Sequence, residues 1–117
     1  MAKGESTHMK ECLEKNDKTM AELEARDPQF RAAWRGLSEQ SKKEGSLSPK
    51  TKELICVALG VMAHCDFCIA SHVQRALEQG ATRGEIIEAA QVAVLMNGGP
   101  AVSYLRYVFD ACDEFGA

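Results

Sequence analysis

The sequence has 117 residues and a net charge of −3, which fits one domain and argues against a nucleic-acid partner. Apolar residues make up 45% and charged residues 26%, as in soluble globular proteins. The most apolar stretches, 54–63 and 89–96, are shorter than the roughly 20 residues that span a bilayer. The polar N-terminus lacks the apolar centre of a signal peptide. We therefore do not expect a membrane protein.

Helix signals follow one another along the chain, and no stretch alternates as a strand would. A charged helix is expected over 7–26, although residues 1–10 are expected to be disordered or partly cloning-derived. Asp27 before Pro28 has the pattern of a helix cap and predicts a helix over 28–43. Phe30, Trp34 and Leu37 share one face of that helix, and we expect this face to belong to the core.

The later helices are marked in the same way. Ser48 before Pro49 predicts a helix over 49–63, and Gly80 ends a helix over 65–79. The run 82–85 fits a capping box that opens a helix over 83–97. The sequence NGGP at 97–100 separates it from a last helix over 100–115. We therefore predict an all-α fold with about five to six helices in one domain, residues 1–117, with its core at about 48–115.

Two of these helices are apolar on nearly every side, over 53–63 and 85–96. A chain of this size has difficulty covering both by itself, since small domains bury a limited fraction of their surface. We therefore expect the chain to form an oligomer.

The five cysteines are an odd and sparse set, unlike a secreted disulfide scaffold. We expect a cytoplasmic protein with reduced thiols, in which a close cysteine pair is more often catalytic or metal-binding than structural. The pair is Cys65 and Cys68. Of the others, Cys56 and Cys112 are expected to pack in the core, and Cys12 is expected to have no special role.

Cys65, Cys68 and His72 fall within an arc of roughly 60° on a helix with about 100° per residue. His72 lies one turn beyond Cys68, within reach of its sulfur. A helix N-terminus favours a thiolate, and Cys-x-x-Cys pairs there commonly have a lowered thiol pKa. If helices 49–63 and 65–79 are antiparallel, Glu53 lies level with His72. An acid that orients a histidine, which in turn activates a thiol, is a common arrangement for nucleophilic chemistry.

Glu53, Cys65-x-x-Cys68 and His72 together resemble the AhpD-like alkylhydroperoxidase branch of the carboxymuconolactone decarboxylase family. The resemblance covers about residues 48–96 and the break at 97–100. It implies an all-helical fold that assembles into trimers or hexamers. It also implies thiol-dependent reduction of hydroperoxides, with no metal or haem cofactor.

The resemblance further implies a role for each residue. Cys68 would attack the peroxide, Cys65 would resolve the product as a disulfide, and Glu53 with His72 would relay protons. A dithiol partner, lipoylated or thioredoxin-like, would reduce the disulfide. Relatives often carry a histidine just before the second cysteine, where this sequence has Phe67. His64, directly before the pair, is a candidate to take over that supporting role.

Other functions compatible with the sequence are a general thiol–disulfide oxidoreductase and a carboxymuconolactone decarboxylase-like enzyme. A metal-binding module is a third alternative, in which Cys65, Cys68 and His72 supply three ligands and His64 or Cys56 the fourth. The last alternative is an oligomeric scaffold in which the cysteines have no chemical role.

Overall fold

The capping signals of the sequence coincide with the ends of six α-helices in the structure, a computed structural model that describes residues 7–117. Asp27 accepts a hydrogen bond from the Phe30 amide, and Ser48 accepts one from the Thr51 amide, both at 3.1 Å. Each end lies within one residue of the expected position. The helices are α1 (His8–Arg26), α2 (Pro28–Lys42), α3 (Pro49–Met62), α4 (Asp66–Glu78), α5 (Arg83–Asn97) and α6 (Gly99–Glu114).

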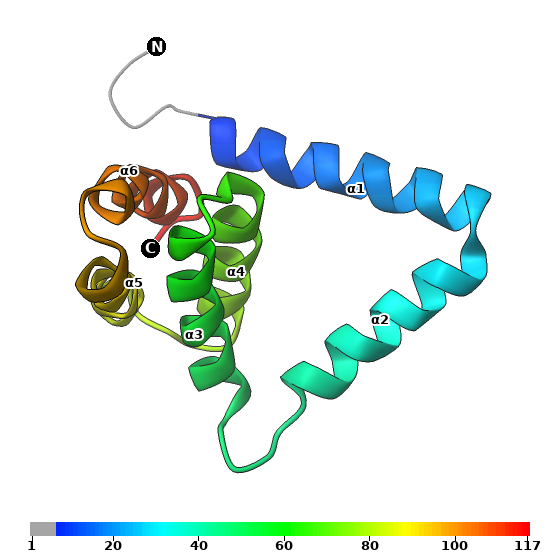
Figure 1. Ribbon diagram of the computed structural model, residues 1–117, viewed down its shortest axis with the longest axis horizontal. Helices are drawn as coiled ribbons and strands as arrows, with labels where there is room; N and C mark the ends of the chain where they lie inside the picture. The colour runs from blue at the N-terminus through cyan, green and yellow to red at the C-terminus, as the bar shows by residue number, and fades with distance from the viewer. Residues whose placement is uncertain (1–6) are drawn as a thin grey trace.

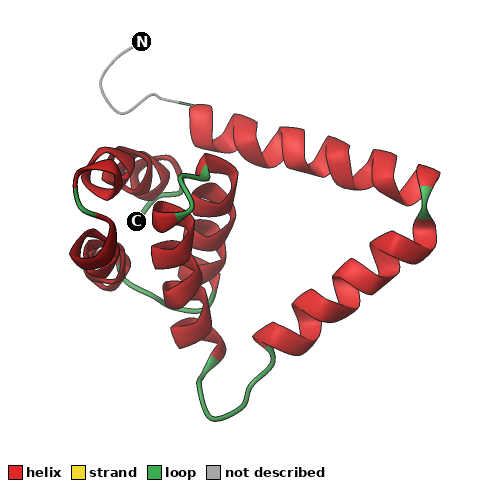
Figure 2. Cartoon of the chain, viewed as in Figure 1, coloured by secondary structure: helices red, strands yellow, loops and turns green. Residues whose placement is uncertain are grey.

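Helices α3 to α6 form a bundle, and α1 and α2 extend from it as a bent arm (Figure 1). The prediction of an all-α fold is confirmed, and no strand occurs within residues 7–117 (Figure 2). The fully buried core side chains come from α3 to α6 and from the start of α1. Among the described residues, no helix combines the length and apolarity that are needed to cross a membrane.

The beginning of the described chain is bound to the bundle. Met9 is fully buried, and the amides of Met9 and Lys10 donate to the Glu114 carboxylate at 3.2 and 3.0 Å. The structure therefore places residues 8–10 in a docked helix, where the sequence indicated disorder. The first six residues of that predicted segment lie outside the described part of the chain.

The expectation that the apolar face of α2 belongs to the core is wrong. Phe30, Trp34 and Leu37 are 58%, 51% and 61% exposed, and α2 has no buried residue. The periodicity correctly identifies an amphipathic helix, but it does not say whether the apolar face meets the same chain. In this structure the face of α2 meets no part of the bundle that would bury it.

Candidate redox site

A tight turn between α3 and α4 places Cys65 at the start of α4. The Cys65 amide donates to the Gly60 carbonyl at 3.1 Å, and the His64 amide donates to the Val61 carbonyl at 3.2 Å. This is the hydrogen-bond pattern of a Schellman motif, in which the residue with positive φ is usually glycine. Here that residue is His64, with φ of 54°. The same turn that ends α3 therefore delivers the first cysteine as the N-cap of α4.

Cys65 and Cys68 form a disulfide with their Cα atoms 5.2 Å apart. The Cys68 amide donates to the Cys65 sulfur at 3.1 Å, so the sulfur caps the helix as a serine oxygen would. Both residues are partly exposed. In the reduced protein, this amide and the positive end of the helix dipole would favour a thiolate on Cys65.

Gly60 allows α3 to approach the cysteine pair closely. A Cβ atom at this position would lie 3.3 Å from the Cys68 Cβ and also 3.3 Å from the Ile69 amide nitrogen. A side chain at Gly60 would therefore push against the first turn of α4.

Glu53 and His72 form the pair that the sequence predicts. Nδ1 of His72 lies 3.0 Å from Oε2 of Glu53, whose side chain is 5% exposed. On its other oxygen, Glu53 has the Nζ atom of Lys42 at 3.6 Å. The buried carboxylate is thus paired with a group from α4 and a group from α2, which lowers the cost of keeping it charged in the core.

Cys56 is the member of this cluster that the sequence reading missed. Ligand atoms of Glu53, Cys56 and His72 all lie within 4.8 Å of one another. Burial alone would lower the pKa of His72, but the hydrogen bonds and electrostatic interactions with Cys56 and Glu53 outweigh it and raise the pKa to about 9. His72 is therefore an imidazolium at neutral pH.

The expected contact between His72 and Cys68 is absent from the hydrogen bonds of the described residues, where the ring instead has Glu53 and Cys56 as partners. Cys68 lies one helical turn before His72, opposite Gly60. The antiparallel pairing of α3 and α4 explains why His72 contacts Cys56. Cys56 lies one turn before Gly60 on α3, and His72 lies one turn after Cys68 on α4. The same register argument that placed Glu53 beside His72 also fits Cys56.

His64 lies beside the pair but contacts the other side of the bundle. Its Nε2 atom lies 3.0 Å from Oδ1 of Asn97, and its ring stacks on Tyr104 with centroids 4.8 Å apart. Phe67, where relatives often have histidine, is 42% exposed. These contacts tie His64 to α5 and α6.

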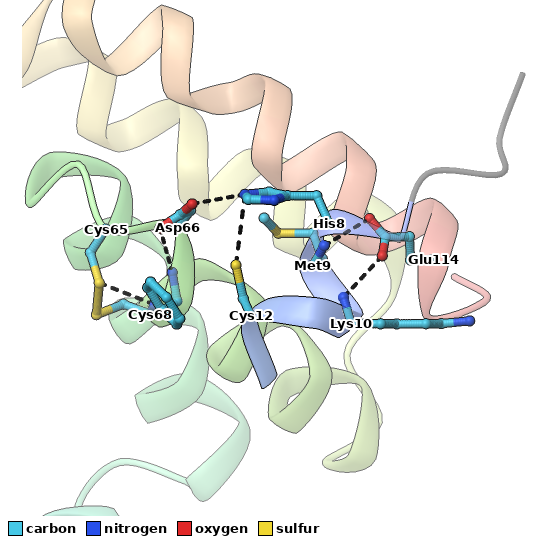
Figure 3. A network of polar contacts seen from close by, with 9 residues as sticks. His8, Met9, Lys10, Cys12, Cys65, Asp66, Cys68 and Glu114 are labelled. Carbon is cyan, nitrogen blue, oxygen red and sulfur yellow. Dashed lines mark hydrogen bonds and ion pairs between the residues drawn. A yellow bond between two sulfur atoms is a disulfide. The ribbon is translucent and has the colours of Figure 1, made fainter. Parts of the chain in front are cut away.

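A second polar cluster lies next to Cys65 and joins α1 to α4 (Figure 3). Nε2 of His8 lies 2.8 Å from Oδ2 of Asp66 and 3.7 Å from the Cys12 sulfur. Burial, reinforced by the charge of Asp66, raises the pKa of Cys12 to about 11. Cys12 is thus a buried neutral thiol within a specific network, although the sequence assigned it no role.

Within residues 7–117, no cluster of possible metal ligands combines Cys65, Cys68 and His72. The clusters found there are His8 with Cys12 and Asp66, and Glu53 with Cys56 and His72. The ammonium of Lys42 beside Glu53 disfavours a cation in the second cluster. The groove between α1 and α4, which Leu13 and Gln74 help to line, includes neither cysteine of the disulfide.

Fold and site together define an all-α protein with a Cys-x-x-Cys disulfide at a helix N-terminus beside a buried acid–histidine pair. Residues 28–111 match the carboxymuconolactone decarboxylase family. The chain belongs to this family, which includes the AhpD-like branch.

Individual relatives cover nearly the whole chain. An uncharacterised protein of Cupriavidus necator is 33% identical over 96% of this chain and 99% of its own. The crystal structure of a carboxymuconolactone decarboxylase family protein from Legionella pneumophila has a TM-score of 0.92 at 32% identity, covering 96% and 100% of the two chains. A family member from Thermotoga maritima, described with a possible antioxidative role, has a TM-score of 0.79 at 26% identity, covering 91% and 90%.

Proposed function

We propose that this protein is a thiol-dependent peroxidase that reduces hydroperoxides with the Cys65–Cys68 pair. The observation that carries the proposal is the disulfide at the start of α4, one helical turn from the His72–Glu53 pair. The antioxidative role named for the Thermotoga relative supports the same reaction class.

In the proposed cycle, the Cys68 thiolate attacks the terminal oxygen of the hydroperoxide and the O–O bond breaks. Cys68 becomes a sulfenic acid, and the alkoxide takes a proton to leave as an alcohol. The Cys65 thiolate then attacks the Cys68 sulfur and forms the disulfide, and the hydroxide that leaves takes a proton and is released as water. A dithiol donor, lipoylated or thioredoxin-like, reduces the disulfide and is itself oxidised.

His72 is the proposed proton donor, because its raised pKa of about 9 keeps it charged at neutral pH. Glu53 holds the ring through Nδ1 and favours the charged form. Neither residue hydrogen-bonds to the disulfide in this oxidised state, so we propose that the proton of His72 reaches the leaving alkoxide through water. The helix N-terminus at Cys65 favours its thiolate, which suits both the resolving step and its departure when the donor attacks Cys68.

We further propose that the protein works in the cytoplasm, where a dithiol donor keeps the pair reduced. The pattern of exposed apolar side chains supports an assembly of several copies, a trimer or hexamer. The most exposed are Val92, Leu95 and Met96 on one face of α5, at 61%, 83% and 74%. Apolar stripes of this kind typically mark protein interfaces.

The test is consumption of an alkyl hydroperoxide by the reduced protein with a dithiol donor, in wild type and in two serine variants. Cys65→Ser should accumulate a trappable sulfenic acid on Cys68, because no resolving thiol remains. Cys68→Ser should lose peroxide reduction. Trapping on Cys65 in the Cys68→Ser variant would reverse the two roles, and unchanged peroxide consumption in both variants would remove the pair from the reaction.

A general thiol–disulfide oxidoreductase is the second candidate, favoured by the capping of the Cys65 sulfur by the Cys68 amide. This geometry assists disulfide exchange whether or not a peroxide is involved. The same reduced protein separates the two functions: an oxidoreductase would reduce a protein disulfide quickly while consuming hydroperoxide no faster than a free dithiol does.

A further inference from the structure

Cys56 has the surroundings of an activated nucleophile, although the disulfide chemistry of Cys65 and Cys68 does not require it. Its sulfur, a ring nitrogen of His72 and a carboxylate oxygen of Glu53 all lie within 4.8 Å of one another. Glu53 holds the ring at 3.0 Å through Nδ1. The thiol, the charged histidine and the orienting acid are thus arranged as nucleophile, positive partner and support.

The surroundings of Cys56 differ from those of the other two free cysteines. Cys12 and Cys112 are 2% and 0% exposed, and burial raises the pKa of both thiols. Cys56 is only partly buried. It is therefore the free thiol that a small reagent can reach and that has a charged histidine beside it.

The charges around this cluster disfavour a bound metal ion. Lys42 lies 3.6 Å from Glu53 and places a positive charge on the side of the cluster away from His72. This ammonium competes with any cation for the Glu53 carboxylate. The sulfur of Cys56 lies beside the positively charged ring of His72.

We propose that Cys56 is a second reactive thiol of this protein, a modification site that forms mixed disulfides with low-molecular-weight disulfides. Cys56 loses its proton to solvent, and its sulfur, beside the charged His72 ring, attacks one sulfur of the small disulfide. The S–S bond of the reagent breaks, a new S–S bond joins Cys56 to one half, and the other half leaves as a thiolate. The reaction needs no peroxide and takes place while Cys65 and Cys68 are joined.

Modification of Cys56 would also affect the disulfide pair. A mixed disulfide on Cys56 adds bulk beside His72 and removes the thiol partner of the ring. The proton chemistry proposed for Cys68 uses the same histidine. Modification of Cys56 is therefore expected to slow the reaction of the pair, because both sites depend on His72.

The test treats the oxidised full-length protein with glutathione disulfide and maps the adducts by peptide mass spectrometry. Wild type should carry the adduct on Cys56, formed at least about ten-fold faster than on Cys12 or Cys112. His72→Gln should slow the adduct at Cys56 at least about ten-fold, because the positive charge beside the sulfur is lost. Unchanged Cys56 reactivity in a folded His72→Gln protein, or equal reactivity of the three thiols in wild type, would overturn the proposal.

Two further variants keep the result decisive. Cys12 and Cys112 report unfolding, because their thiols react only when the core opens. If His72→Gln exposes them, Glu53→Gln replaces it and must slow Cys56 for the proposal to stand. A variant with both Cys65 and Cys68 changed to serine should still form the adduct on Cys56, which separates this site from peroxide reduction by the pair. Loss of the adduct there, with Cys12 still protected, contradicts an independent site.

Discussion

The charge of His72 connects the candidate site to the stability of the fold. The ring is partly buried between α3 and α4, where an unpaired cation would be costly. Glu53 and Cys56 offset that cost, and the net effect is a raised pKa of about 9. A single residue thus links helix packing, proton supply and the state of a nearby thiol.

We expect the folded protein to lose stability between pH 6.5 and pH 9. The pKa of His72 rises from 6.5 to about 9 on folding, so its contribution is complete below pH 6.5 and is lost as pH rises through 9. Each pKa unit corresponds to about 1.4 kcal/mol, which partial exposure reduces, so a loss of about 1–2 kcal/mol is expected.

Urea unfolding of the oxidised protein at the two pH values measures this loss. His72→Gln should show little change over the same range. The buried thiols of Cys12 and Cys112 ionise above this range, so they do not disturb the comparison. An equal loss of stability in wild type and variant would assign the effect to other groups.

The sequence predicts part of this site because helical register is simple geometry. The antiparallel pairing of the helices places Glu53 near His72, and a 3.0 Å contact joins them. The same pairing places Cys56 there, but a cysteine in an apolar run is usually a buried packing residue, and its sequence context favours that interpretation. The contact of His8 with Asp66 could not be foreseen, since it depends on how α1 docks against α4.

The helices themselves were predictable to within a residue, because caps are local. Proline, serine, aspartate and glycine act on the backbone that they adjoin, so Ser48 and Gly80 mark boundaries without knowledge of the fold. Packing partners are not local. The sequence therefore predicts the apolar face of α2 correctly, but it wrongly predicts that this face is buried in the core.

Gly60 is expected to be essential to the contact between α3 and α4. Gly60→Ala places a methyl group 3.3 Å from both the Cys68 Cβ and the Ile69 amide nitrogen. Overpacking of this kind typically costs about 1–3 kcal/mol, and it should outweigh the better helix propensity of alanine.

Gly36 provides the matched control, because it lies within α2 and a Cβ atom added there would meet nothing within 4 Å. Gly36→Ala should stabilise the protein by up to about 1 kcal/mol. Denaturant unfolding of both variants measures the two effects. A Gly60→Ala protein as stable as wild type would show that the first turn of α4 yields without cost.

The turn at His64 can be tested with two substitutions that remove the same ring. Both His64→Gly and His64→Ala lose the contacts with Asn97 and Tyr104. Only glycine adopts the φ of 54° without strain, so the glycine variant should be more stable by about 1 kcal/mol. Thermal unfolding of the oxidised proteins gives the comparison. An alanine variant of equal or greater stability would contradict this account of the turn.

The single chain leaves several large apolar side chains exposed on its surface. One apolar stripe follows α5 through Val92, Leu95 and Met96, and another follows α2 through Phe30 and Trp34. A single copy of the chain therefore leaves part of the apolar segment 85–96 exposed to solvent. This surface motivates the prediction of an assembly.

Light scattering at micromolar concentration should give the mass of a trimer or a hexamer. Leu95→Glu should shift the distribution toward smaller species without unfolding them, because Leu95 is 83% exposed in the single chain. Gln79→Glu adds the same charge at an exposed position outside the stripe and should leave the assembly intact. A monomeric wild-type protein would contradict the prediction.

The most direct test of the redox site is a mass measurement on the reduced protein before and after one equivalent of hydroperoxide. The account predicts a loss of two hydrogen atoms, located by peptide mapping to a disulfide between Cys65 and Cys68, with one alcohol formed for each disulfide. The result that would contradict it is a peroxide-treated protein in which both of these thiols remain free and can still be alkylated.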